Sequence, residues 1–391
     1  MITSASLNGA SSKHHSKLHP YNALGILACI FFAKTLGCQP NSTLSAQPIA
    51  KLATDFTNIW SARELSDGRV LVSDNRERKL VVIIPGSASL TVIGRVGDGP
   101  GEYQIPTQLI AIGLDSTILI DGGTRRWLLL IQSRIVALPD RFRSAAITGK
   151  GILTGIDNYG NVFRTHGIDR SNPGSLYFVT GQPCCVRELA LVRYSSTEPV
   201  SDTIAKMRGG WAGEKRRVVQ MGTHSEGYTL GSGFPTWDQA AVFSDGRIAV
   251  VSPSPYSVDW YLPSGRRISS ARMPENEVRV TQEMKRTVAE EHSMPGAVPD
   301  DFASWPASIP AFLRDATVAG SDGMLYIRRS LIRRADSVSI DRIDQKNKRE
   351  SFRLPPRSRI VGVGSRGLYV ALKDEDDVET LALYSIAPTK R

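Results

Sequence analysis

Short turns rich in Asp and Gly recur along this chain, and each is followed at once by a short apolar segment. They lie at residues 66–68, 114–116, 158–160, 244–246, 321–323 and 365–367. Glycine accepts positive φ and aspartate can bond its own backbone, so these turns suit tight hairpins. A short apolar run between such turns predicts a strand, because it is too short for a helix. In each repeat the turn joins a first strand to the apolar segment that follows it, and a third apolar segment comes next. A repeat of several strands at this spacing predicts a β-propeller.

The spacing between successive turns indicates the number of blades. Their third residues are 48, 44, 86, 77 and 44 positions apart. Three of these intervals match one repeat, whereas the two longer ones contain insertions or, in the interval of 86, a further blade. We expect six blades, and hence an all-β, six-bladed β-propeller domain over residues 48–391.

The last repeat lacks a fourth strand of its own. Strand-like segments lie at residues 359–363, 368–372 and 380–386, and no candidate for another strand follows them. We therefore expect residues 48–56 to pair with the last blade and close the ring. Closure of this kind covers sheet edges that would otherwise be open to aggregation.

The insertion at residues 273–310, between blades four and five, contains one helical segment. Residues 281–292 favour a short helix because Thr281 can cap its start and Glu283 suits its first turn. A proline-rich arm follows the helix. Two interpretations remain open, namely a lid over the ring and a buttress packed for stability.

The N-terminal segment has the features of a targeting sequence. Residues 1–20 contain basic residues and no acid, and residues 23–33 form an apolar run that suits a signal peptide but is too short to span a bilayer. Residues 35–38 resemble a bacterial lipobox, although Thr35 and Leu36 depart from its usual pattern. We predict a signal peptide at 1–38, of the lipoprotein type with Cys38 as the lipidation site. Ordinary signal-peptidase cleavage is the alternative.

Residues 39–47 are rich in Ser, Thr, Pro and Asn, and we expect them to be a flexible tether. With this leader the protein would be exported to the periplasm or cell envelope, and a lipid on Cys38 would hold it at a membrane. In the folded domain the cysteines are Cys184 and Cys185. Adjacent cysteines can form a disulfide only as a strained ring. The other interpretation is that Cys184 and Cys185 are unpaired and serve as two small apolar residues in a loop.

The stretch from Gly94 to Leu128 resembles an NHL repeat. It has a Gly-rich turn at residues 94–101, an aromatic residue and a proline at Tyr103 and Pro106, a strand bounded by aspartate at residues 115–121, and Arg126 before the next apolar strand. The match covers blades one and two and is weak elsewhere. The chain also resembles the exported six-bladed propellers of bacteria. These resemblances imply a fold and no settled activity.

A four-stranded antiparallel blade places its turns on two faces of the ring. The turns between strands 1–2 and 3–4 are short here, and we call their side the short-turn face. The 2–3 loops and the connections between blades are long and varied, and they define the long-loop face. Long loops gathered on one face are typical of a binding face.

Arginines are concentrated in the predicted loops of the long-loop face. Arginine binds carboxylate and phosphate groups well because it offers several donors in a fixed fork. The predicted ligand-binding residues are Arg76, Arg78, Arg125, Arg126, Trp127, Arg328 and Arg329. A solvated basic rim, balanced in part by the acidic run at residues 374–377, is the alternative interpretation.

Two functional classes remain. The expected mature chain has three isolated histidines and no sequence motif of a serine hydrolase, a zinc protease or a P-loop. This favours a non-catalytic binding or scaffold propeller without a cofactor, whose partner is an unknown protein or an anionic ligand. The alternative is a metal-dependent, lactonase-like hydrolase or lyase, with a metal such as Ca²⁺ held in the central channel. The predicted innermost strands are mostly apolar, which favours the first class.

The formal net charge of +10 is only mildly basic for 391 residues, and three of the lysines lie before Cys38. Such a balance indicates solubility more than a nucleic-acid footprint. We therefore expect no nucleic-acid partner, and we expect a monomer.

Overall fold

The structure is a computed structural model. It describes residues 48–87, 90–140, 142, 151–168, 176–177, 187–197, 201–210, 215–221, 224–275, 277–291, 296–331 and 336–385. The predicted signal peptide, Cys38, the tether, Cys184 and Cys185 lie outside these residues. Within them, no helix is long and apolar enough to cross a membrane.

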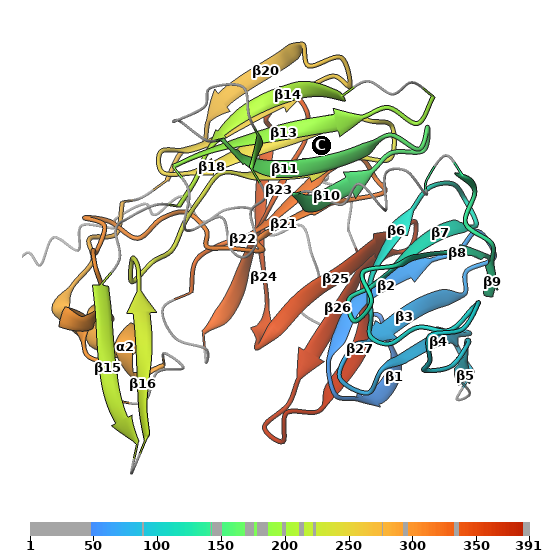
Figure 1. Ribbon diagram of the computed structural model, residues 1–391, viewed down its shortest axis with the longest axis horizontal. Coiled ribbons are helices and arrows are strands. Elements are labelled where there is room, and N and C mark those ends of the chain that lie inside the picture. The colour runs from blue at the N-terminus through green and yellow to red at the C-terminus, as the bar shows by residue number, and fades with distance from the viewer. Residues whose placement is uncertain are drawn as a thin grey trace, which may run out of the picture. The chain divides into compact units, whose positions relative to one another are not determined.

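Six antiparallel sheets form the blades of a β-propeller, as predicted (Figure 1). Blade one contains β2 (Ile59–Glu64), β3 (Val70–Asp74), β4 (Lys79–Ile83) and β5 (Leu90–Val92). Blade two contains β6 (Pro106–Ala111), β7 (Ser116–Asp121), β8 (Trp127–Ile131) and β9 (Arg134–Val136). Blade three contains β10 (Ile152–Ile156), β11 (Val162–Ile168), β13 (Glu188–Tyr194) and β14 (Ser201–Arg208), with β12 (Leu176–Tyr177) paired to β11.

Blades four to six continue this order. Blade four contains β17 (Gln239–Val242), β18 (Ile248–Pro253), β19 (Tyr256–Tyr261) and β20 (Arg267–Arg272). Blade five contains β21 (Thr317–Ala319), β22 (Leu325–Arg328), β23 (Ser337–Ile343) and β24 (Arg349–Pro356). Blade six contains β25 (Ser358–Gly364), β26 (Gly367–Lys373) and β27 (Glu379–Tyr384). All six turns identified in the sequence join the first and second strands of a blade.

The fourth strand of blade six comes from the other end of the domain. It is β1 (Ala50–Phe56), which pairs antiparallel with β27 and places Ala50 opposite Leu383 and Phe56 opposite Glu379. The chain then continues directly into β2 of blade one. The predicted closure of the ring is therefore confirmed.

The first strands of the blades contact one another and form the inner wall of the ring. β2 lies beside both β6 and β25, and β17 lies beside both β10 and β21. Glycine permits the closest of these approaches. A Cβ atom added at Gly362 in β25 would lie only 2.0 Å from the carbonyl oxygen of Ala62 in β2. A larger residue there would push two neighbouring blades apart.

Hydrophobic packing occurs between neighbouring blades, with one buried cluster at each of the six junctions. Strand β3 shows how a continuous apolar run serves this arrangement. Val70 and Val72 pack toward blade six, whereas Leu71 between them packs toward blade two. Side chains alternate across a strand, so a strand buried on both sides must be apolar at successive positions.

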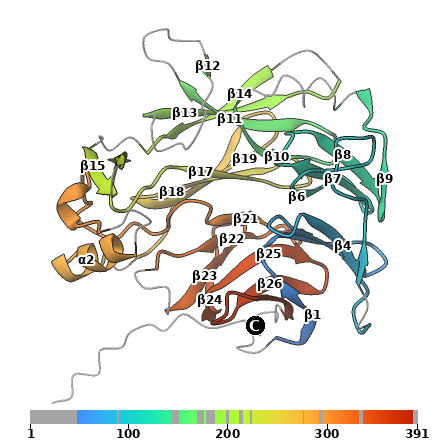
Figure 2. The same cartoon turned by 60° about the horizontal axis from the view of Figure 1, so that its bottom comes forward.

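The two long intervals of the sequence contain insertions that pack together. One is the hairpin of β15 (Lys215–Met221) and β16 (His224–Leu230), and the other contains α2 (Gln282–Glu290) and the 3₁₀ helix η2 (Pro299–Asp301). We call these four elements the insertion lobe; α2 lies beside β15 in Figures 1 and 2, and η2 contacts both. Their shared cluster consists of Leu230, Ala289, Ala297 and Phe302.

The predicted helix is confirmed, with slightly narrower bounds. It begins at Gln282, and the Thr281 hydroxyl accepts a hydrogen bond from the Met284 amide at 3.2 Å. It packs on the β15–β16 hairpin in their common cluster.

Candidate functional site

Arginines on both faces of the ring form contacts between blades. On the short-turn face, arginines connect one blade to the next. Arg69 bonds Asp67 within its own turn at 2.6 Å and Ser133 of blade two at 3.1 Å. Arg366 of blade six bonds Glu64 of blade one at 2.9 Å. These side chains already have partners, so they contribute to the cohesion of the ring.

Arg63, at the short-turn end of β2, is the most buried of these connectors. Its guanidinium donates to the backbone oxygen of Leu114 in the next blade at 3.0 Å, and to the hydroxyl of Thr117. Burial lowers the pKa of Arg63 to about 10, although the nearby charge of Asp115 opposes the shift. Arg63 is therefore charged at neutral pH and held by oxygens of blade two.

On the long-loop face, aspartates at the ends of second strands organise the loops. Asp74 accepts bonds from the amides of Thr57 and Arg76, at 2.8 and 2.9 Å. Asp121 accepts bonds from the amides of Ile105 and Gly123, at 2.8 and 3.1 Å. Each carboxylate thus ties an incoming connection between blades to a 2–3 turn. This is the physical basis of the aspartate-bounded strand in the sequence repeat.

Two predicted ligand residues, Arg78 and Arg126, are also engaged in these loops. The Nε atom of Arg78 donates to the carbonyl oxygen of Gln104 at 2.6 Å. The Nη1 atom of Arg126 donates to the carbonyl oxygen of Asp98 at 2.8 Å, and its Nε atom donates to Thr124 at 3.0 Å. Both arginines therefore hold the Gly-rich connection between blades one and two.

Trp127 lies in the hydrophobic cluster between blades two and three and is 6% exposed. The guanidinium carbon of Arg164 lies 5.6 Å from the centre of its ring. The structure thus places Trp127 in the core, where it stabilises the junction between blades.

Two other predicted ligand residues, Arg76 and Arg125, lie on the 2–3 turns of blades one and two. Both side chains are exposed, and neither guanidinium has a hydrogen bond or ion pair to a described residue. Arg125 has a φ of 60°, a left-handed conformation that its tight turn requires. Both residues lie on the long-loop face, and their role in ligand binding stays a prediction.

Arg329 belongs to a buried polar network between blades four and five. Its centre is Asp341 of β23, which is 3% exposed. The Asp341 carboxylate accepts bonds from the hydroxyls of Tyr256 at 2.9 Å and Ser351 at 2.6 Å. It also accepts from Arg329 at 3.3 Å and lies 3.7 Å from a nitrogen of Arg349. Opposite charges and hydroxyl donors thus compensate the desolvation of a buried carboxylate.

Tyr256 remains protonated in this network. Burial raises the pKa of its phenol well above the usual value, and the negative charge of Asp341 raises it further. The guanidinium of Arg329 lies over the Tyr256 ring, 4.6 Å from its centre. The hydroxyl therefore acts as a hydrogen-bond donor that fixes the carboxylate.

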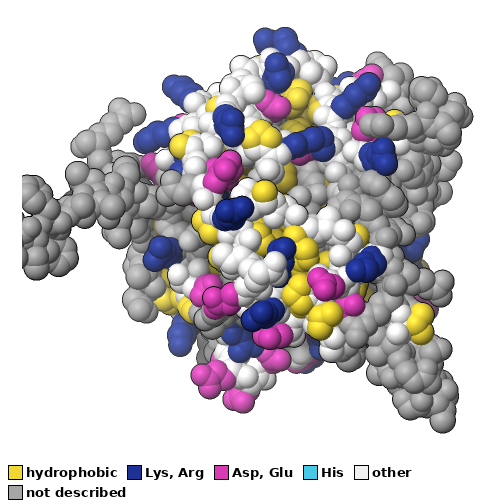
Figure 3. All heavy atoms as spheres, turned by 90° about the vertical axis from the view of Figure 1, so that its left-hand side faces the viewer, with side chains coloured by type: hydrophobic (Ala, Val, Ile, Leu, Met, Phe, Trp, Pro, Cys, Tyr) yellow, Lys and Arg dark blue, Asp and Glu magenta, His cyan; other side chains and the backbone are white. Residues whose placement is uncertain are grey.

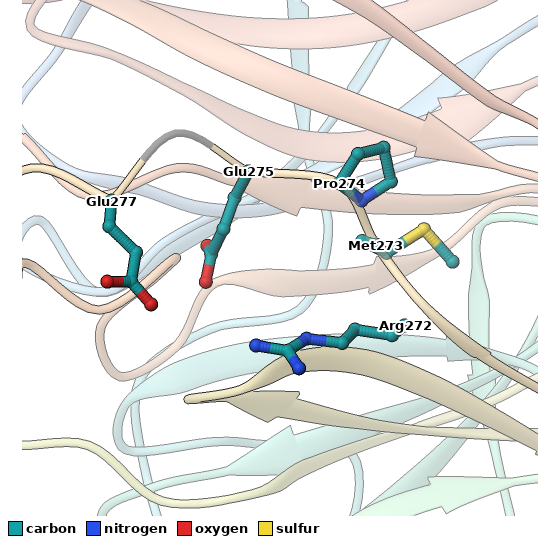
Figure 4. Close-up of a pocket in the computed structure, with 5 residues that line it drawn as sticks. All are labelled: Arg272, Met273, Pro274, Glu275 and Glu277. Carbon is teal, nitrogen blue, oxygen red and sulfur yellow. The ribbon is translucent and has the colours of Figure 1, made fainter.

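A surface recess of about 370 Å³ borders this network on the long-loop face. It is lined by Arg272, Met273, Pro274, Glu275 and Glu277. Figure 4 shows the Arg272 guanidinium extending below the Glu275 carboxylate, with Glu277 pointing to the same side. Arg329 lies 3.6 Å from Glu275, and Arg349 donates to the backbone oxygen of Pro274 at 2.6 Å. The buried network thus holds one wall of the recess.

A second recess, of about 280 Å³, lies beside the insertion lobe. Its lining residues are Gly209, Gly210, Ser232, Phe234, Thr236, Ser304, Trp305 and Pro306. Gly233 permits the close approach of the arm, because a Cβ atom there would lie 2.1 Å from the Trp305 ring. Both recesses flank blade four. Figure 3 shows basic and acidic side chains interspersed around a hydrophobic area on one side of the molecule.

Arg328 ends β22, and its amide donates to the backbone oxygen of Ala316 at 2.9 Å. Burial lowers the pKa of its guanidinium. As for metals, no three His, Cys, Asp or Glu side chains of the described residues are grouped closely enough to hold an ion.

Sequence reasoning found Arg329 but missed its partners Asp341 and Tyr256. They lie on different blades, and their proximity depends on the way two sheets pack. One signal was available, because an aspartate in the middle of an apolar third strand must find partners when that strand is buried.

No protein-family model matches the chain, and no curated protein matches it either. The chain is similar to the solved structure of a protein from Bacteroides fragilis designated as exported, with 14% identity, coverage of 88% of this chain and 94% of that one, and a TM-score of 0.45. It is also similar to a gluconolactonase from Xanthomonas campestris (9% identity, 89% and 94% coverage, TM-score 0.39). A third similar structure is a streptogramin B lyase (11% identity, 85% of both chains, TM-score 0.36).

Proposed function

We propose that this protein is a non-catalytic binding or scaffold propeller that recognises an anionic partner through its long-loop face. The observation that carries the proposal is the position of two exposed arginines among the long and varied loops of this face. Arg76 and Arg125 lie in the 2–3 turns of blades one and two, and neither guanidinium has a partner among the described residues. The two recesses and the insertion lobe belong to the long-loop face as well.

The proposal includes export to the periplasm or cell envelope. It is supported by the basic, acid-free start of the chain, the apolar run at residues 23–33 and the lipobox-like residues 35–38. Mass spectrometry of the protein purified from a bacterial host tests this part. We expect a chain that begins at Cys38 and carries a lipid. An intact leader would contradict export, and a cleaved chain without lipid would contradict only the anchor.

The binding face can be tested with heparin as a polyanionic probe. Replacing Arg76 and Arg125 with Ala should weaken heparin binding by about 1–2 kcal/mol, because charge-assisted hydrogen bonds are lost. The loss should be larger at low salt, since exposed charges are screened over about 10 Å at about 0.1 M ionic strength. Surface plasmon resonance over a series of salt concentrations measures both effects.

A matched control exists on the short-turn face. Arg134 and Arg266 are exposed there, and their guanidinium groups have no partner among the described residues. Replacing both with Ala removes the same charge without breaking a connection between blades, and binding should be unchanged. Equal weakening by the two double variants would show that the faces are wrongly assigned. Turnover of a lactone that depends on Ca²⁺ would contradict the non-catalytic part of the proposal.

A further inference from the structure

Three arginines of blades five and six come together at the inner edge of the long-loop face. Arg314 lies just before β21, Arg328 ends β22, and Arg359 is the second residue of β25. β21 and β25 are neighbours in the inner wall of the ring. The amide of Arg328 is bonded to Ala316, at 2.9 Å, which places it beside the start of β21.

Most of the donors of these arginines have no partner among the described residues. The Nη2 atom of Arg359 makes all of that guanidinium's bonds to described residues, at 2.9 Å to Asn58 and at 2.9 Å to both carboxylate oxygens of Glu379. Its Nε and Nη1 atoms make none. The guanidinium groups of Arg314 and Arg328 have no hydrogen bond or ion pair to a described residue.

The electrostatic surroundings of Arg328 favour a bound anion. Burial lowers the pKa of Arg328, the carboxylate of Asp315 opposes this shift, and the charges of Arg359 and Arg314 lower it further. A partly desolvated cation beside two like charges is unfavourable unless a negative group compensates it. Among the described residues, the carboxylate of Asp315 acts on Arg328 and that of Glu379 is bonded to Arg359.

An exposed aromatic residue lies near the same edge. Trp60 of β2 is 49% exposed, a high value for tryptophan in the first strand of a blade. β2 and β25 run beside each other, with Ala62 next to Gly362, and Arg359 bonds Asn58 two residues before Trp60. Trp60 can therefore offer an apolar surface to a ligand held by the arginines.

We propose that Arg314, Arg328 and Arg359 bind the carboxylate or phosphate group of a small ligand, with Trp60 contacting the apolar part of that ligand. This inference rests on the proposed function, since it assigns the ligand class and the principal site on the long-loop face. It moves the principal site from the rim, at Arg76 and Arg125, to the inner edge of the ring.

Thermal unfolding with four probes tests the inference: inorganic phosphate, phenyl phosphate, acetate and benzoate. At a concentration near 100 times its Kd, the best probe should raise the Tm of the wild-type protein by roughly 3–4 °C. Comparing the rise in Tm with phosphate and with acetate distinguishes a phosphate ligand from a carboxylate ligand. Phenyl phosphate and benzoate should raise the Tm more than phosphate and acetate do. In Trp60→Ala this difference between the probes should disappear.

Arg328→Met separates a ligand-binding role from a structural one. Without an anion the variant should have an unchanged or higher Tm, because a partly buried charge beside two like charges has been removed. With the best probe it should show no rise in Tm. A residue that only stabilises the fold would give the opposite result, namely a lower Tm and an unchanged response to the probe.

Arg134→Met, on the short-turn face, is the matched control and should respond to the probes like the wild type. A rise in Tm that persists in Arg328→Met would overturn the inference, as would a wild-type Tm that none of the four probes raises. The heparin comparison of the rim arginines would still decide the proposed function in either case.

Discussion

His166 shows at the residue scale how the interior of a blade controls ionisation. Its side chain is 1% exposed, and Nε2 lies 2.9 Å from the hydroxyl of Tyr194. Nδ1 has no hydrogen-bond partner in the part of the chain that the structure describes. Burial, and then the positive charge of Arg164, lower the pKa of His166 to about 4. The imidazole is therefore neutral in the folded protein at any pH well above this value.

A neutral His166 should make the protein sensitive to acid. The unfolded chain takes up a proton near pH 6.5, the ordinary histidine value, whereas the folded chain does so near pH 4. The neutral imidazole contributes its full share to the free energy of unfolding above the pKa that His166 has in the unfolded chain. This share, up to about 3 kcal/mol, is lost as the pH falls from about 6.5 to about 4.

His166→Gln removes this titration. Urea unfolding between pH 7 and pH 4 should show a shallower loss of stability for the variant than for the wild type, whatever its stability at pH 7. Parallel curves for the two proteins would mean that His166 does not titrate in this way.

Single positions were only partly predictable from the sequence. Asp74 and Asp121 stand out in the repeat, and the structure gives them clear roles in ordering loops. Arg126 and Trp127 also stand out in the repeat. The sequence cannot show that Arg126 is bonded to the connection between blades one and two, or that Trp127 lies in the core. The partners of Asp341 come from two blades, so only the packed structure shows them.

At the scale of elements, β1 is the strand on which the closure of the ring depends. It covers the edge of β27, and Phe56 is buried in the cluster between blades six and one. Its existence followed from the sequence, because the last repeat offered three strands and the first offered a spare one. All six hairpins were also predictable, because the Asp and Gly residues that favour a tight turn act locally.

The insertion lobe was less predictable. The helix was visible from its cap, but the contact between α2 and the β15–β16 hairpin joins segments from two different inter-blade connections. No local pattern in the sequence specifies that contact. The same limitation applies to the recess beside the lobe, whose walls come from three separate segments.

Two truncations test the role of β1. Deleting residues 39–57 removes the strand and exposes the β27 edge, so the Tm of the whole domain should fall sharply. Deleting residues 39–46 leaves β1 intact, and the Tm should be unchanged. Thermal unfolding followed by circular dichroism compares the two, and equal melting temperatures would show that closure contributes little.

For the whole molecule, the direction of β1 has a consequence for orientation. Ala50 pairs with Leu383, near the end of β27 on the short-turn face, and Phe56 pairs with Glu379 at the opposite end. The strand therefore enters the ring from the short-turn face. Ile49, the residue before β1, donates to the backbone oxygen of Leu383 at 2.8 Å and lies on that side, away from the loops to which we assign binding.

A lipid on Cys38 would anchor the propeller to the membrane on the side of its short-turn face. The nine residues 39–47 can span at most about 30 Å when fully extended, so the short-turn face would lie close to the bilayer. A fluorescent amino acid at Ser264, in a short turn, should then be quenched by labelled lipid more strongly than one at Arg76. Equal quenching would show that the tether imposes no orientation. With this geometry the long-loop face is turned toward the aqueous compartment, where partners arrive from solution and not along the membrane.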